Sequence, residues 1–430
     1  MRKIVINIAL ALLPMAVFSQ GARQEISQDI YKSGSNYYAY PGPTQSKLTK
    51  APKGKKPFYI SHYGRHGSRY LINEGDYDNA WRTLTRADSL GKLTDYGKDV
   101  LSRVARLRDE AHNRLGELTL RGAQQHRGIA RRMMERFPEV FKGKTNIDAR
   151  STTVIRCILS MENALQEMVS MNNKLVVSHD ASQHDMWYMN RGVRRLSQNR
   201  MPEPVQKAYD DFCSRHEHHD RLMLRIFNDE NYWKNEVNAS QLNYQLFKLA
   251  SNVQSTELRH ELSLYDLFNE QEIYENWLQT NAWWYINYGP YPGNGGEQPF
   301  REASLLKKMI TDADSCLNFA HPGATLRYGH EVCVLPLACL MELDDCGKRI
   351  ADLEQVADQG WRCYDIFPMA CNVQIVFYRK NPSDKDVLIK VLLNENETRL
   401  PLPSDQHPYY RWSDFRDYFL KKIEAFEKEN

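Results

Sequence analysis

The chain has 430 residues, enough for one large domain with an insertion or for two domains that share a deep cleft. Charged residues make up 26% and aromatic residues 11%, which is ordinary for a folded globular protein. The formal net charge is +3, and it approaches neutrality once the basic start at Arg2 and Lys3 is removed. Bulk nucleic-acid binding is therefore excluded, because it normally requires a strong basic excess.

An apolar run from Ile4 to Phe18 follows this basic start. The run is too short to cross a bilayer, and it ends in residues that a signal peptidase accepts. We expect residues 1–19 to be a signal peptide cleaved after Ser19, the alternative being a buried N-terminal helix. No other stretch of the sequence is long and apolar enough to span a membrane, so we expect no membrane insertion and a periplasmic or secreted location.

Eight cysteines follow the predicted signal peptide. An even number in an oxidising compartment permits disulfides, but the pairing cannot be read from the sequence. Cys333 and Cys339 lie in apolar surroundings, which favours free buried thiols.

Residues 20–55 are polar and are expected to form an extended, partly mobile lead-in. Strand and helix patterns then alternate along the chain. The predicted strands are 57–63, 147–151 and 175–178. The predicted helices are 80–115, 118–136 and 154–171.

Residues 183–300 differ in composition, being rich in Tyr, Trp, Asn, Glu and Arg with long helical patterns. Strand patterns return at 324–328, 372–378 and 386–393, the last two as an antiparallel pair, and a helix is predicted over 413–428. These patterns predict an α/β domain built from 20–182 and 301–430, interrupted by a mostly helical inserted cap domain at 183–300.

The residues best suited to catalysis form the run Arg65-His66-Gly67-Ser68-Arg69, directly after the first predicted strand. Open α/β sheets present catalytic groups where a strand enters such a glycine-flanked turn. Two guanidinium groups bracket one imidazole, and arginine binds phosphate oxygens through paired N–H donors. The run suits a phosphate monoester, which is a dianion, although by itself it is equally compatible with a basic surface loop.

The same run matches Arg-His-Gly-x-Arg, and the sequence resembles the histidine acid phosphatases over nearly all of its predicted mature length. Further matches follow in the family's order: Leu-Thr-x-x-Gly at 118–122, Arg-Ser-Thr-x-x-x-Arg at 150–156 and a His-acid pair at 330–331. Segments 391–395 and 412–415 resemble the branch of multiple inositol polyphosphate phosphatases, also called phytases. The resemblance implies a phosphoglycerate-mutase-like α/β domain with a helical cap and chemistry without a metal or other cofactor.

The resemblance also implies a role for each matching residue. His66 would be the nucleophile that forms a phosphohistidine, and Glu331 would protonate the leaving alkoxide and then activate water. Neutral imidazole can attack phosphorus, and a carboxyl group can serve first as acid and then as base. The groups that would bind the phosphoryl oxygens are Arg65, Arg69, Arg156 and His330.

One departure concerns the acid. The family usually has Asp directly after the histidine or Glu two positions after it, whereas Glu331 directly follows His330 here. An apolar helical pattern at 332–341 begins next to this pair, and Pro336, which a helix tolerates in its first turn, places the helix start close to Glu331. A helix N-terminus at the site would add to anion binding.

Weaker signals have ordinary alternatives. Asp180 follows a predicted strand and is a candidate to line the pocket, and Arg191, with 194 and 195, is a candidate for a basic wall that binds further phosphates. The basic run at 53–56 is a second candidate for that wall. The histidines at 216, 218 and 219 favour a solvated helix end over a metal site, because no spaced partner completes a ligand set. For Arg191, Arg194 and Arg195, a solvated helix face is an equally good explanation.

The sequence therefore predicts a phosphomonoesterase acting on a small-molecule substrate, inositol hexakisphosphate and lower inositol polyphosphates. A broad acid phosphatase for sugar phosphates is the alternative within the class. A phosphate-ligand binding protein without turnover is the alternative outside it.

Overall fold

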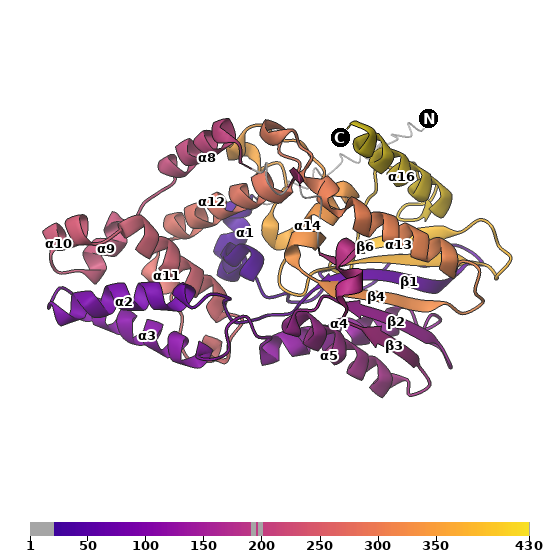
Figure 1. The fold of residues 1–430 in the computed structure, drawn as a ribbon, viewed down its shortest axis with the longest axis horizontal. Coiled ribbons are helices and arrows are strands. Elements are labelled where there is room, and N and C mark those ends of the chain that lie inside the picture. Colours follow the sequence, from indigo (N-terminus) through magenta and orange to yellow (C-terminus); the bar gives the residue numbers. More distant parts are fainter. Residues whose placement is uncertain (1–20, 191–194, 197–200, 430) are drawn as a thin grey trace, which may run out of the picture.

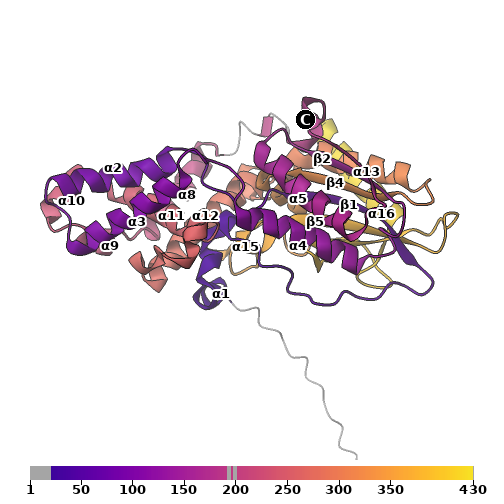
Figure 2. The same ribbon diagram turned by 90° about the horizontal axis from the view of Figure 1, so that it is seen from below.

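The computed structural model describes residues 21–190, 195–196 and 201–429. The predicted signal peptide, Arg191 and Arg194 lie outside these ranges. Figures 1 and 2 show a half built around a β-sheet and a half built from helices. Within the described ranges, no helix combines the length and apolar character needed to cross a bilayer.

The central sheet positions the segments that contain the sequence motifs. Its strands are β1 (Lys56–Arg65), β2 (Asn146–Ser151), β3 (Val176–Asp180), β4 (Gly323–Gly329), β5 (Asn372–Arg379), β6 (Leu388–Leu393), β7 (Asn396–Glu397) and β8 (Tyr410–Arg411). They lie in the order β3-β2-β4-β1-β5-β6-β7, with β8 also paired to β6. β3, β2, β4 and β1 are parallel, whereas β5 and β6 are antiparallel to their neighbours. The six predicted strands and the predicted antiparallel pair are confirmed.

Helices cover both faces of the sheet (Figures 1 and 2). α4 (Leu120–Arg136) and α5 (Ile155–Met171) lie on one face, and α13 (Ala303–Cys316), α14 (Glu331–Leu340) and α16 (Trp412–Glu429) lie on the other. Side chains of β1 alternate between the two cores: Ile60 packs toward α4 and α5, while Tyr59 and Tyr63 pack on the opposite side. Central strands buried on both faces are rich in apolar and aromatic residues, and Phe58, Tyr59, Ile60 and Tyr63 give β1 this character.

The helical half draws on two stretches of chain. α2 (Gly75–Ser89) packs against α11 (Ala239–Val253), and α3 (Asp95–Ala111) packs against α9 (Asp220–Ile226). This half also contains α8 (Glu203–Arg215), the short α10 (Glu230–Glu236) and α12 (Glu270–Tyr288). The predicted domain boundary at 183 assigned 75–111 to the α/β domain. An amphipathic helix reveals that it has a partner but not which one, so the sequence could not place α2 and α3.

Three local predictions are corrected. The single helix predicted over 80–115 is interrupted between α2 and α3, where Gly91 has φ +67° and Thr94 caps α3 by accepting a hydrogen bond from Gly97 N. The lead-in is not extended throughout, because α1 (Ala22–Gln28) and η1 (Ile30–Tyr37) are helical and contact α12. Pro336 lies in the second turn of α14 rather than in the first, although the helix does begin at Glu331.

All eight cysteines lie in described residues and are unpaired. Cys333 and Cys339 are 1% and 2% exposed, so the prediction of free buried thiols is confirmed for both.

Candidate active site

The carboxyl ends of the central parallel strands bring together residues that are far apart in the sequence. β1 ends at Arg65 and leads into His66, while β4 leads directly into His330 and Glu331. β2, the other neighbour of β4, leads through a short loop to Arg156 in the first turn of α5. The three sequence motifs therefore meet at one edge of the sheet, as expected for catalytic groups in an open α/β fold.

The loop that carries His66 is pressed against the start of α4. A Cβ atom added to Gly67 would lie 2.5 Å from the carbonyl oxygen of Gly122, and one added to Gly122 would lie 2.3 Å from that of Ser68. Thr119, the N-cap of α4, donates its hydroxyl hydrogen to the Ser68 carbonyl at 3.1 Å. The Leu-Thr-x-x-Gly segment thus holds the catalytic loop, because only glycine permits this backbone contact.

His66 is held in one tautomer. Its Nδ1 atom lies 2.9 Å from the carbonyl oxygen of Gly67, which can only accept, so Nδ1 carries the proton. The Nε2 lone pair then faces Glu331, whose Oε2 atom is 3.6 Å away. Burial, with Arg65 and Arg156 adding to it, holds the pKa of His66 well below its usual value despite the nearby carboxylate. A neutral imidazole with a free Nε2 lone pair is the form that can attack phosphorus.

His330 lies beside His66. Its ring is 5.7 Å from the ring of His66, centroid to centroid, in an edge-to-face arrangement. The hydroxyl of Thr152 lies 3.2 Å from His330 Nε2. Burial lowers the pKa of His330 to about 4, so the ring is neutral near pH 7 and can donate one N–H to an oxygen.

Three arginines supply the positive charge. Arg65 is fully buried, and its Nη1 atom donates to the carbonyl oxygen of Asn36 at 2.6 Å and to that of Phe367 at 3.1 Å. Arg69 donates through Nη1 to the carbonyl of Tyr70 at 2.9 Å. The pKa of Arg156 is lowered by burial and by Arg69, which shows how closely the guanidinium groups are gathered. These backbone contacts orient the arginines while leaving other N–H groups free.

Several nitrogen atoms of this cluster make no hydrogen bond to any described residue. They are Nη2 of Arg65, Nε2 of His66, Nε of Arg69 and Nε of Arg156; Nε of Arg65 makes no hydrogen bond either but is ion-paired with Glu331 Oε2 at 3.1 Å. Buried polar groups are normally paired, and leaving one unpaired costs about 1–3 kcal/mol. Such a concentration of unsatisfied nitrogen atoms marks a binding site for an oxygen-rich anion.

Glu331 is the one carboxylate in the cluster within the described part of the chain. Its Oε2 atom lies 3.1 Å from Arg65 Nε, and the side chain is only 11% exposed. Burial alone would raise the pKa of Glu331, but Arg65, the contact with His66 and Arg69 outweigh it and hold that pKa well below its usual value. Glu331 is therefore ionised in this structure, where it occupies space between Arg65 and His66.

Spacing alone would allow a metal here, because ligand atoms of His66, His330 and Glu331 lie within 4.8 Å of one another. The charge does not fit a cation, since Arg65 and Arg156 stand at the same site with unpaired N–H groups. Cationic neighbours favour an anion in this position.

Other predicted site residues are not brought to this cluster. Asp180 is exposed at the end of β3, an edge strand separated from β1 by β2 and β4. Arg195 pairs with Glu297 at 3.1 Å. The basic run at 53–56 lies at the end of β1 opposite to His66, where Lys55 pairs with Asp384 at 3.0 Å, so the structure does not place it as a wall beside this cluster.

Some supporting residues were not singled out from the sequence. Tyr37 places its ring under Arg69, with the guanidinium carbon 5.7 Å from the ring centroid. Asn252 donates to the carbonyl of Arg69 at 3.1 Å, and Gln125 accepts from Ser68 N at 2.9 Å. No local sequence pattern identifies Tyr37 or Asn252. Tyr37 comes from η1 and Asn252 from α11, and only the tertiary structure brings them to Arg69.

Residues 65–394 match the sequence family described as the histidine phosphatase superfamily, branch 2. This chain belongs to that family. No protein in the curated set matches the sequence closely enough to count as a relative. Family membership agrees with the gathering of the motif residues at one edge of the sheet, and it makes a phosphatase the expected class of enzyme.

Solved structures of other proteins share the fold. The apo form of a multiple inositol polyphosphate phosphatase from Bifidobacterium longum has a TM-score of 0.78 at 18% identity, with 90% of this chain and 97% of that chain covered. The phytase from D. castellii has a TM-score of 0.67 at 13% identity, with 92% and 85% covered. A Hafnia alvei phytase in complex with myo-inositol hexakis sulphate has a TM-score of 0.54 at 11% identity, with 86% and 98% covered. These similarities confirm the predicted α/β fold with many helices.

Proposed function

We propose that this protein is an exported phosphomonoesterase that hydrolyses inositol hexakisphosphate and lower inositol polyphosphates through a phosphohistidine on His66. The observation that carries the proposal is the group of unpaired buried nitrogen atoms around the free Nε2 lone pair of His66. A phosphoryl group placed there would accept hydrogen bonds from Arg65, Arg69 and Arg156 while its phosphorus faces the nucleophile.

In the first step, His66 Nε2 forms a bond to phosphorus and the bond to the ester oxygen breaks. The electron pair leaves with that oxygen, which takes a proton from the carboxyl group of Glu331. In the second step, water attacks the phosphohistidine and Glu331 takes the water proton, which releases inorganic phosphate and restores neutral His66. The arginines stabilise the charge on the equatorial oxygens in both steps.

Glu331 must gain a proton and move before it can act. In the empty site it is ionised and lies beside Arg65 and His66, where the phosphoryl group would be bound. A bound phosphate adds negative charge next to the carboxylate, which raises the pKa of Glu331. Displacing the carboxylate also frees it to turn toward the leaving oxygen, which lies opposite His66 in an in-line attack.

The choice of inositol phosphates rests on the fold relatives. Bifidobacterium longum multiple inositol polyphosphate phosphatase has been solved with inositol hexasulfate, and the Hafnia alvei enzyme with myo-inositol hexakis sulphate. Both ligands are sulfate analogues of a fully phosphorylated inositol. Export to the periplasm or the exterior rests on the apolar run that ends near Ser19. Roles for Asp180 and Arg191 in the pocket remain proposals of the sequence alone.

A broad acid phosphatase acting on sugar phosphates is the second candidate. It is favoured by a neighbouring cavity whose lining contains a single lysine, Lys248, and no arginine among the described residues. Such a cavity does not select for a heavily phosphorylated ring.

One assay separates these functions. Purified protein is incubated with inositol hexakisphosphate, glucose 6-phosphate and nitrophenyl phosphate, and the phosphate released is measured with and without a strong chelator. We expect release that withstands chelation and is inhibited by vanadate, because the proposed mechanism uses imidazole and arginine. Release from every ester at similar kcat/KM favours the broad phosphatase. Tight binding of phosphate without release from any ester supports the non-catalytic alternative and contradicts the proposal.

A further inference from the structure

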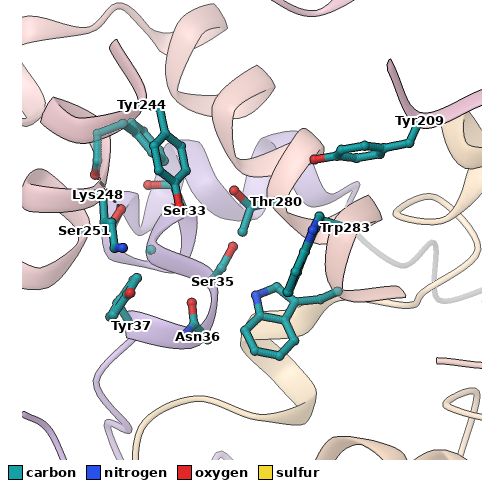
Figure 3. A pocket seen from close by; sticks show the side chains of 13 residues that line it. Ser33, Ser35, Asn36, Tyr37, Tyr209, Tyr244, Lys248, Ser251, Thr280 and Trp283 are labelled. Carbon is teal, nitrogen blue, oxygen red and sulfur yellow. Dashed lines mark hydrogen bonds between the residues drawn. The ribbon is translucent and has the colours of Figure 1, made fainter. Parts of the chain in front are cut away.

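A cavity of about 420 Å³ lies beside the arginine cluster, between η1, α8, α11 and α12. Figure 3 shows side chains from these elements facing one another across it. Aromatic rings and hydroxyl groups make up most of the lining. The volume lies within the range of about 300–1,000 Å³ found for small-molecule sites.

Two residues that line the cavity also contact the arginine cluster formed by Arg65, Arg69 and Arg156. Asn36 lines the cavity, and its carbonyl oxygen accepts the hydrogen bond from Arg65 Nη1 at 2.6 Å. Tyr37 also lines it, and the ring of Tyr37 lies under the guanidinium group of Arg69. The cavity therefore adjoins the arginines and lies close to any molecule whose phosphate they hold.

The lining is close to neutral. Lys248 is the one charged side chain among the described lining residues, and its Nζ atom lies 2.6 Å from Asp76 Oδ1. Several phosphate groups would be poorly compensated here, because each brings up to two negative charges. The charge of the cavity therefore argues against a ring that carries phosphates on all sides.

The polar groups suit hydroxyls instead. Thr280 Oγ1 donates to the carbonyl of Asn276 at 3.0 Å, and Tyr209 Oη donates to that of Gln279 at 3.3 Å. Both oxygen atoms thereby keep lone pairs that can accept from ligand O–H groups. Tyr244 is 58% exposed and offers a phenol, while the neighbouring aromatic rings offer flat apolar faces to the C–H bonds of a saturated ring.

We propose that this cavity receives the polyhydroxylated ring of the substrate, with free hydroxyl groups rather than phosphates directed into it. The proposal rests on the proposed phosphatase function and narrows it. The enzyme would act on rings that carry one or a few phosphates with a higher kcat/KM than on inositol hexakisphosphate.

The test places a bulky side chain in the cavity. In Thr280→Phe a ring replaces the hydroxyl on the cavity wall, and kcat and KM are measured for myo-inositol monophosphate and for ethyl phosphate, which has no ring. We expect KM for the monophosphate to rise so that the ratio of the two kcat/KM values falls at least tenfold. Thr311→Phe is the matched control, because Thr311 is exposed on α13 and its hydroxyl likewise bonds a carbonyl four residues earlier. Its ratio should equal that of the wild type.

A more conservative variant tests the same cavity with less risk of misfolding. Tyr244→Phe keeps the ring and removes only the hydroxyl of an exposed side chain, and we expect KM for the monophosphate to rise about two- to tenfold, the value of one hydrogen bond. Unchanged ratios in both cavity variants, or a higher wild-type kcat/KM for inositol hexakisphosphate than for the monophosphate, would overturn the inference. Failure of the proposed function would look different. The wild type would then release phosphate from none of inositol hexakisphosphate, myo-inositol monophosphate and ethyl phosphate.

Discussion

His66 Nδ1 lies 2.9 Å from the carbonyl oxygen of Gly67, its own neighbour in the chain. This contact assigns the ring proton to Nδ1 and leaves Nε2 with a free lone pair, as the proposed nucleophile requires. The same Gly67 makes a backbone contact with Gly122 at the start of α4, so the position of the imidazole depends on a glycine pair that joins two motifs. The orientation of the His66 imidazole is therefore set by backbone contacts.

The first prediction concerns His66. His66→Ala should lower phosphate release by at least about a thousandfold, because the imidazole bonds to phosphorus during catalysis. Circular dichroism and thermal unfolding should show a folded protein. His179→Ala, at an exposed position on β3, serves as the control and should retain activity. A folded H66A protein with more than about a thousandth of the wild-type rate would contradict the assignment.

The glycine contact gives a second prediction. In Gly122→Ala the new Cβ atom would lie 2.3 Å from the Ser68 carbonyl oxygen, so the catalytic loop must shift. We expect about 1–3 kcal/mol of destabilisation and about a hundredfold loss of kcat/KM. Both are measured, by urea unfolding and by phosphate release.

Gly128→Ala is the control on the same helix. Its added Cβ atom would meet only a side chain, that of Arg132, at 3.1 Å, and no backbone atom. Because Glu395 holds the Arg132 guanidinium group, the better helix propensity of alanine is partly offset, and we expect stability to change by less than about 1 kcal/mol, with unchanged activity. Equal effects of the two substitutions would show that the contact between Gly67 and Gly122 is unimportant.

Glu331 is tested with two leaving groups. An inositol alkoxide needs a proton to leave, whereas nitrophenolate is stable without one. Glu331→Gln should reduce hydrolysis of inositol phosphates about a hundred- to ten-thousandfold, with a much smaller effect on the first chemical step with nitrophenyl phosphate. Because the second step also uses Glu331, we expect a burst of nitrophenolate followed by slow turnover in rapid-mixing experiments. Modest, parallel losses for both substrates without a burst would instead show that Glu331 stabilises the start of α14 electrostatically.

The buried carboxyl of Glu302 predicts a pH dependence of stability. Glu302 is 3% exposed, and burial raises its pKa to about 8, with Arg301 opposing the shift. Between about pH 4.5 and 8 the unfolded chain loses this proton while the folded protein keeps it, so the free energy of unfolding falls as pH rises, by up to about 1.4 kcal/mol per pH unit.

Glu302→Gln cannot titrate and should remove this loss. In urea unfolding, we expect E302Q to gain stability relative to the wild type on going from pH 5 to pH 8. Glu270→Gln, at an exposed position in the first turn of α12, is the control and should show no such trend. A constant difference between E302Q and the wild type at all pH values would mean that Glu302 is not held protonated by the fold.

Much of the fold could be predicted because its signals are local. β1 carries a run of apolar and aromatic residues, 57–60, that suits a strand buried on both faces, and α16 shows its amphipathic repeat within 18 residues. The break between α2 and α3 was missed although Gly91 and Thr94 are turn and cap residues, because the amphipathic pattern continues across it. The two helices pack against each other, but each also packs against a helix more than a hundred residues away, α11 or α9, that leaves no local trace.

The sequence by itself determined which residues are the candidates for the chemistry: the run around His66, the second arginine motif and the pair His330-Glu331 are each contiguous. Only the tertiary structure decided what these residues can do. The lone pair on His66 Nε2, the ionised state of Glu331 beside Arg65 and the shared lining of the neutral cavity all depend on distances between separate segments. Hydrogen bonding and electrostatic interaction act over a few ångströms in space, and chain order does not specify that separation.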